Sequence, residues 1–185
     1  MIFLPEYAGG LRSDGAKILP PSAPEDAHGF LEAVRTAAAR LRVWVSVGSV
    51  AVDGPDGRIH NRGYMIGERG EIVGRYDKLH LFDVDLSDGH VYRESETVQP
   101  GAVARACHTP VALVGHTISY DLRFPHLFRD LAQAGAEIIC CPAAFTKETG
   151  KAHWHVLNRA RAIENTVFVV SPCAVVAVPV GGECY

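Results

Sequence analysis

Three segments of the chain place a reactive side chain where a strand-like run of residues ends. Glu6 follows the run Met1–Pro5, Lys78 comes just after Ile72–Tyr76, and Ser119 closes a third apolar run. Functional sites of α/β proteins form at the carboxyl ends of strands, so these groups could meet. A hydroxyl, a carboxylate and an ammonium suit acyl transfer, in which the carboxylate moves protons and the cation stabilises an oxyanion. Taken alone, the three residues also fit ordinary solvated side chains.

The elements that would position these groups include both helices and strands. Apolar residues recur at helical spacing over residues 24–42, with acidic residues first and arginines last, and further helices are predicted over 125–134 and 151–164. Residues 9–24 and 83–101 are predicted to be irregular connections. Apolar, β-branched runs predict strands at Met1–Pro5, Val43–Val52, Ile59–Gly67, Ile72–Tyr76, Val111–Ser119, Ala136–Cys141 and Thr166–Val170.

This order predicts one α/β layered domain over residues 1–185, with a hairpin in the middle and a mixed sheet. The net charge is −3 and the basic residues are scattered, which argues against a nucleic-acid partner. No apolar run approaches the roughly 20 residues that span a membrane, so no membrane partner is expected. The start of the chain has no signal-peptide pattern, and we expect a cytoplasmic protein.

The cysteines and histidines do not predict a metal site. The five cysteines are an odd number without CxxC spacing, and they are interpreted as reduced structural thiols. His153 and His155 lie two residues apart near a helix start but lack a third partner with convincing spacing. We interpret both as packing or pocket-lining residues, and His80 as a structural hydrogen-bonding residue.

Longer motifs follow one another in a distinctive order. They are Pro5-Glu6, YDKLHLFDVD (76–85), YRES (92–95), SYDLRFP (119–125), PAAFT (142–146) and RARAIEN (159–165). The series resembles the nitrilase superfamily of carbon–nitrogen hydrolases, on its amidase side. The resemblance implies an α-β-β-α sandwich, a small amide as substrate, no metal or organic cofactor, and a homodimer or higher homo-oligomer.

The resemblance also implies roles for individual residues. Glu6 is the general base, and Lys78 stabilises the tetrahedral intermediate together with the backbone N–H of Tyr120. Glu94 matches a second glutamate that orders the site near Lys78. Ser119 stands where the family has its cysteine nucleophile.

The serine is the most consequential departure from the family pattern. A thiol has a pKa of about 8.5 and can become a thiolate beside a basic carboxylate, whereas a hydroxyl is far less acidic. Three interpretations stay open: an engineered knock-out, a natural pseudoenzyme that binds without turnover, and a working serine variant. We also expect the chain to lack the first strand and helix and the C-terminal strands of the family fold.

Several residues near the motifs are candidates for substrate binding. Arg123 could hold a substrate carboxylate or form a structural salt bridge with a neighbour such as Asp121. Phe145 and Thr146 are expected to line the pocket. His155 replaces a glutamate frequent in relatives and could change the charge at the pocket mouth.

The sequence therefore predicts a hydrolase of non-peptide C–N bonds in small carboxylic amides, which releases ammonia through an acyl-enzyme and is disabled or weakened by Ser119. The first alternative is a non-catalytic ligand-binding pseudoenzyme. The second alternative is nitrile hydrolysis, which the Leu-Arg-Phe-Pro context (122–125) favours less than amide hydrolysis.

Overall fold

The computed structural model describes residues 1–14, 17–86 and 89–174. The helices are α1 (Gly29–Leu41), α2 (Pro125–Gln133) and α3 (Lys147–Asn165), with 3-10 turns η1 (Glu25–Ala27), η2 (Pro55–Gly57), η3 (Glu94–Glu96) and η4 (Ser119–Arg123). The strands are β1 (Ile2–Phe3), β2 (Arg12–Asp14), β3 (Lys17–Leu19), β4 (Ser22–Ala23), β5 (Val45–Asp53), β6 (Ile59–Ile66), β7 (Ile72–Asp77), β8 (Asp83–Asp85), β9 (Val91–Arg93), β10 (Arg105–His108), β11 (Leu113–His116), β12 (Ile138–Cys140) and β13 (Phe168–Val170).

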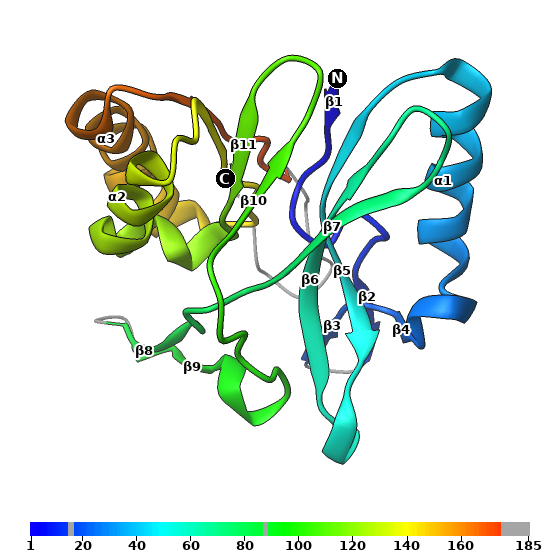
Figure 1. Ribbon diagram of the computed structural model, residues 1–185. Helices are drawn as coiled ribbons and strands as arrows, with labels where there is room; N and C mark the ends of the chain where they lie inside the picture. The colour runs from blue at the N-terminus through cyan, green and yellow to red at the C-terminus, as the bar shows by residue number, and fades with distance from the viewer. Residues whose placement is uncertain (15–16, 87–88, 175–185) are drawn as a thin grey trace.

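Two sheets form the middle of the molecule, with helices on both outer sides (Figure 1). One sheet has the order β1-β5-β6-β7, with β4 also pairing with β5, and α1 covers it. The other has the order β10-β11-β12-β13, and α2 and α3 cover it. Both sheets mix parallel and antiparallel pairs. The α-β-β-α sandwich predicted from the sequence is therefore confirmed.

Apolar residues fill each interface between layers. Leu31 and Ala38 of α1 pack on the β5–β6 face, and Phe128 and Leu131 of α2 pack around Ile139. Between the two sheets lies a smaller cluster of Met65, Cys107, Val114 and Cys140. β5 is buried along nearly its whole length, and its valines lie among small residues that include Ser46 and Ser49.

Several element boundaries differ from the sequence prediction. The helix predicted over residues 24–42 begins at Gly29, where the His28 side chain caps it, and η1 precedes it. The last helix begins at Lys147, four residues before the predicted start, because Thr146 caps it. The strand predicted over Val111–Ser119 ends at His116, so Ser119 lies in η4 and not in a strand.

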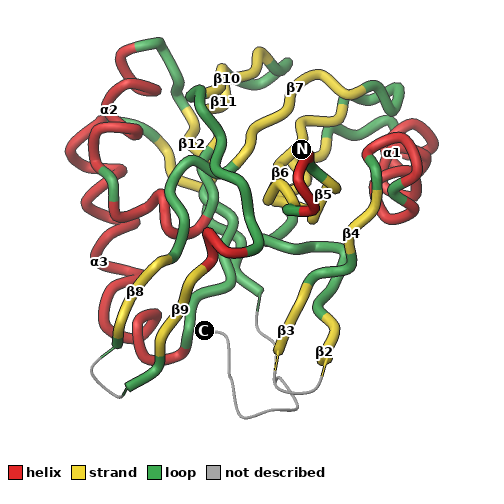
Figure 2. The backbone as a smooth tube through the Cα atoms, turned by 90° about the horizontal axis from the view of Figure 1, so that it is seen from below, coloured by secondary structure: helices red, strands yellow, loops and turns green. Residues whose placement is uncertain are grey.

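The connections hold structure that the sequence did not predict. Residues 9–24 contain β2, β3 and β4, and residues 83–101 contain the β8–β9 hairpin and η3. β10 was also not predicted. Both short hairpins lie toward the lower end of the sandwich in Figure 1, the end that faces the viewer in Figure 2. Within the described residues, β2 pairs with β3 and β8 pairs with β9. β8 and β9 are mostly exposed, so no alternating apolar pattern marks them in the sequence.

Candidate active site

Glu6 lies just beyond β1 and is buried, with a relative exposure of 4%. Its Oε1 accepts hydrogen bonds from Asn61 Nδ2 at 2.9 Å and from Lys78 Nζ at 3.2 Å. Its Oε2 accepts one from the backbone N–H of Ala144 at 2.9 Å. The next residue, Tyr7, has a left-handed backbone (φ 50°), and its N–H donates to Ser49 Oγ. The carboxylate is therefore fixed by donors on several different segments.

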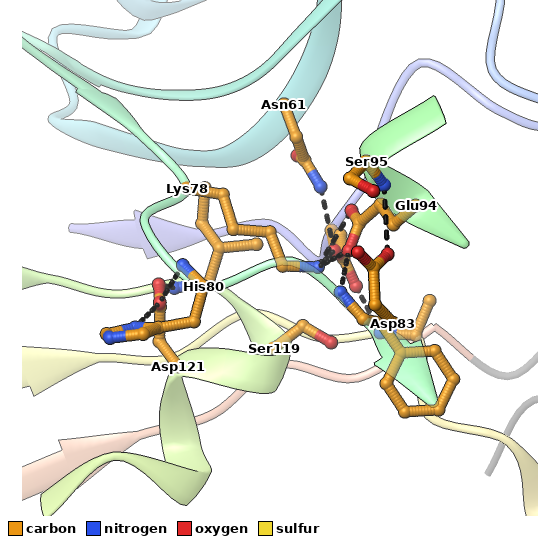
Figure 3. Close-up of polar contacts among 12 residues, drawn as sticks. Asn61, Lys78, His80, Asp83, Glu94, Ser95, Ser119 and Asp121 are labelled. Carbon is orange, nitrogen blue, oxygen red and sulfur yellow. Dashed lines mark hydrogen bonds and ion pairs between the residues drawn. The ribbon is translucent and has the colours of Figure 1, made fainter. Parts of the chain in front are cut away.

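Lys78 follows β7 and joins the two predicted glutamates (Figure 3). Its Nζ lies 3.2 Å from Glu6 Oε1, and 3.0 and 2.9 Å from the two oxygens of Glu94. Burial by itself would lower the pKa of Lys78, but the charges of Glu6 and Glu94 outweigh it, so the pKa is raised. The ammonium therefore stays charged although its side chain is only 3% exposed.

Glu94 is held in place by the β8–β9 hairpin region. It begins η3 directly after β9, and its Oε2 accepts a hydrogen bond from the backbone N–H of Phe82 at 2.6 Å. In return, the N–H of Glu94 donates to the carbonyl of Phe82 at 3.3 Å. Nearby, the pKa of the Tyr7 phenol is raised by burial and by the charges of Glu94 and Glu6. The hairpin region thus fixes the second carboxylate beside Lys78.

Ser119 sits at a tight turn after β11 and is 7% exposed. Its backbone is left-handed (φ 51°), which is uncommon for a residue other than glycine, and its N–H donates to the carbonyl of Pro142 at 2.8 Å. In Figure 3 the Ser119 hydroxyl points to the side on which the Lys78 amine and the Glu94 carboxylate lie. The structure thus joins Glu6, Lys78 and Glu94 by direct contacts and places the turn of Ser119 beside Lys78 and Glu94 (Figure 3).

Asp121 anchors the turn that carries Ser119. Its Oδ2 accepts from the backbone N–H of Ile118 at 2.8 Å and from the Tyr76 hydroxyl at 2.7 Å. Its Oδ1 accepts from the backbone N–H of His80 at 3.0 Å and lies 2.7 Å from the Nδ1 of the same residue. His80 therefore makes structural hydrogen bonds, as predicted. Burial, followed by the charge of Asp121, raises the pKa of Tyr76 and keeps its hydroxyl protonated as a donor.

Three of the substrate-binding candidates cluster beside this turn. The Arg123 guanidinium lies 5.8 Å from the centre of the Tyr120 ring and 5.6 Å from that of Phe145, and its Nη1 lies 3.2 Å from His153 Nδ1. The alternative salt bridge between Arg123 and Asp121 is not present in the described structure, because Asp121 is engaged by other donors. Arg123 is thus stacked between aromatic rings close to Ser119.

The other two candidates are Thr146, which directly precedes α3, and His155, which lies within it. Thr146 caps the helix, since its Oγ1 accepts from the Thr149 N–H at 3.4 Å and lies 2.7 Å from the Thr149 Oγ1. His155 lies on the exposed side of α3. The structure therefore gives Thr146 a structural task and leaves His155 at the surface.

Asn61, Asp121 and the Ala144 N–H have contacts at the site that sequence reasoning missed. Asn61 looks like an ordinary polar position in a strand, and Asp121 was considered only as a partner for Arg123. A buried asparagine is recognisable only once its fully buried position in β6 is known. A backbone donor such as Ala144 leaves no signal in a sequence at all.

The cysteines near Ser119 cannot supply an easily ionised thiol. Burial raises the pKa of Cys140 to about 12 and raises that of Cys141 further. Cys141 Sγ lies 4.0 Å from the carbonyl oxygen of Ser119. Cys107, Cys140, Cys141 and Cys173 form no disulfide within the described part of the chain, and Cys184 lies outside the described residues.

Within residues 1–14, 17–86 and 89–174, no three or more His, Cys, Asp or Glu side chains are grouped so that they could hold a metal ion. Within those same ranges, no helix is both long and apolar enough to cross a membrane.

Comparisons with known proteins identify the family of this chain. The Carbon-nitrogen hydrolase family matches residues 1–184. Deaminated glutathione amidase of Yersinia enterocolitica is 49% identical over 146 residues, which are 77% of this chain and 51% of that protein. The chain thus spans about half the length of this relative.

Solved structures of the nitrilase superfamily share the fold. The C. elegans NitFhit protein superimposes with a TM-score of 0.82 at 29% identity, covering 100% of this chain and 45% of that one. Saccharomyces cerevisiae Nit3, a member of branch 10 of the nitrilase superfamily, gives 0.76 at 28% identity, covering 89% of this chain and 57% of its own. Since the family matches residues 1–184, the chain belongs to the carbon–nitrogen hydrolases of the nitrilase superfamily.

Proposed function

We propose that this chain carries the acyl-transfer site of an amidase that hydrolyses the C–N bond of small carboxylic amides and releases ammonia. The observation that carries the proposal is the buried Glu6–Lys78–Glu94 ion cluster beside the turn of Ser119. Buried charges are costly unless paired, so a cluster of this kind at the carboxyl ends of strands points to chemistry. The names of the amidase relatives support the same bond type.

In the proposed mechanism, the side chain at position 119 attacks the amide carbonyl while Glu6 takes its proton. The Lys78 ammonium and the Tyr120 N–H stabilise the oxyanion of the tetrahedral intermediate. The C–N bond then breaks, and Glu6 passes the proton to the departing nitrogen, which leaves as ammonia. Water next attacks the acyl-enzyme, Glu6 takes one of its protons, and the carboxylic acid and the free side chain are regenerated.

Glu94 serves this mechanism by holding Lys78. It contacts Nζ with both oxygens, and Phe82 fixes its own position. Two carboxylates keep the ammonium charged and immobile, as a fixed oxyanion partner requires. Arg123, stacked near Ser119, is the candidate for contacting the rest of the substrate.

Ser119 makes the site weak as an enzyme. A serine hydroxyl is far less acidic than the cysteine thiol that the family uses, so the same carboxylate activates it less well. The same serine therefore favours a second candidate function, a binding protein that keeps the pocket but turns over no amide.

Ammonia release from a panel of small ω-amides tests the proposal, measured with the chain as given and with Ser119→Cys. Release by the Ser119→Cys variant alone supports an amidase site disabled at the nucleophile. Release by both makes serine a working nucleophile. No release by either would contradict the amidase proposal and leave the binding protein in its place.

A further inference from the structure

The two oxygens of the Glu6 carboxylate face different sheets. Oε1 contacts Asn61 of β6 and Lys78 just beyond β7, both of which belong to the first sheet. Oε2 contacts the N–H of Ala144, which follows β12 of the second sheet. The carboxylate therefore bridges the sandwich, with one oxygen assigned to each side.

The turn that carries residue 119 lies against the segment that contacts Oε2. The Ser119 N–H donates to the carbonyl of Pro142, two residues before Ala144, so the two segments are in contact. A carboxylate oxygen offers two lone-pair directions. Asn61 and Lys78 engage both on Oε1, whereas Ala144 engages one on Oε2. Among the described residues, one acceptor direction of Oε2 thus has no hydrogen bond.

We propose that Asn61 is a positioning residue that makes Oε2 the proton acceptor for the nucleophile. This inference rests on the proposed function. The bond between the nucleophilic atom of residue 119 and its proton breaks, an Oε2–H bond forms, and the electron pair stays on the attacking atom. The same oxygen later gives the proton to the departing nitrogen.

The environment of Asn61 agrees with this role. It is fully buried in β6, and its Oδ1 has no hydrogen-bond partner among the described residues. A buried, half-satisfied amide costs stability compared with an apolar residue of similar shape. Its single side-chain hydrogen bond, from Nδ2 to Glu6, is therefore the contact that accounts for an asparagine at this position.

The test uses the Ser119→Cys protein as background and adds Asn61→Leu or Asn61→Asp. Asn165→Leu is the matched control, because Asn165 is also buried, donates through Nδ2 and has an unpartnered Oδ1 in the described structure, but lies at the end of α3. Two quantities are measured against pH: kcat and KM for ammonia release, and the rate at which iodoacetamide alkylates the thiol at position 119, resolved by peptide mass spectrometry.

Asn61→Leu is expected to lower kcat roughly 10- to 100-fold, because a base displaced by a fraction of an ångström transfers protons poorly. KM should stay within about threefold, since substrate contacts are unchanged. The acid limb of alkylation, which is the pH range where the rate falls as the solution becomes more acidic, should move up by about one pH unit. The reason is that the charged Glu6 carboxylate loses the hydrogen bond from Asn61. Asn61→Asp, similar in size, should move the limb further through like-charge repulsion, and it keeps the test open if Asn61→Leu does not fold.

An unmoved acid limb together with a kcat within about twofold of the background would overturn the inference. So would an equal movement of the limb in Asn165→Leu. If the background releases no ammonia but its alkylation limb moves with Asn61→Leu, the amidase proposal fails and the positioning role of Asn61 stands.

Discussion

Replacing Lys78 by methionine should destabilise the protein in a way that depends on pH. The ammonium is buried and pairs with Glu6 at 3.2 Å and with Glu94 at 2.9 Å. Removing it leaves two carboxylates close together without their cation. Breaking a buried pair from one side costs about 3–5 kcal/mol, and we expect this loss of unfolding free energy for Lys78→Met at pH 8.

The pH dependence separates this electrostatic cost from a simple packing defect. The folded pKa of Lys78 is raised, so its contribution is fully present below the unfolded value and is lost only as the pH rises through the folded one. Between pH 8 and 5 the contribution of the wild-type lysine therefore stays constant. In Lys78→Met the unpaired carboxylates take up protons as the pH falls, which relieves their repulsion, so the difference from wild type should shrink.

Urea unfolding of both proteins at pH 8 and pH 5 measures this difference. Arg75→Met is the control, because Arg75 pairs with Glu25 at 2.7 Å but is 47% exposed, and an exposed pair contributes at most about 1 kcal/mol. A loss for Lys78→Met that is equal at the two pH values, or no larger than that of Arg75→Met, would refute the reasoning.

Two further predictions concern the support of the site. Asp121→Asn should lower the free energy of unfolding by about 2 kcal/mol, measured by thermal melts. The reason is that a charged acceptor of hydrogen bonds from Ile118, Tyr76 and His80 becomes a neutral amide. An unchanged melting temperature would contradict the role of Asp121 as the anchor of the Ser119 turn. Burial lowers the pKa of His116 from 6.5 to about 4, so this residue should remove about 3 kcal/mol of stability as the pH falls from 6.5 to 4. In His116→Gln, the loss of stability that His116 causes between pH 6.5 and 4 should be absent from urea unfolding. A pH profile parallel to that of the wild type would argue against this role of His116.

The site residues that could be predicted from the sequence are those with a reactive side chain directly after an apolar strand. Glu6 and Lys78 follow apolar strands, and a buried strand such as β5 is evident from composition alone. The sequence predicts Ser119 in a strand, whereas it lies in a turn that Asp121 anchors, and two partners of Asp121, Tyr76 and His80, are distant in the sequence. Hydrogen bonds across such separations leave no local pattern.

Exposed strand pairs and helix caps account for the other differences between the predicted and observed elements. The β8–β9 hairpin is polar and mostly exposed, so it reads as a loop, although it precedes the turn that places Glu94. The sequence predicts the start of α3 at residue 151, four residues late, because the cap that Thr146 makes is not evident without the fold. In both cases the missing information was which partner a polar side chain selects.

The bridging position of Glu6 has a consequence for how the site comes into existence during folding. Its three hydrogen bonds join residues separated by 55, 72 and 138 positions along the chain. Contacts of such long range require large loops to close and form late, after local helices and hairpins. Asn61 and Lys78 belong to the same half of the sandwich as Glu6, whereas Ala144 belongs to the other half. The first half folded alone would therefore hold the glutamate by Oε1 but leave Oε2 without its backbone donor.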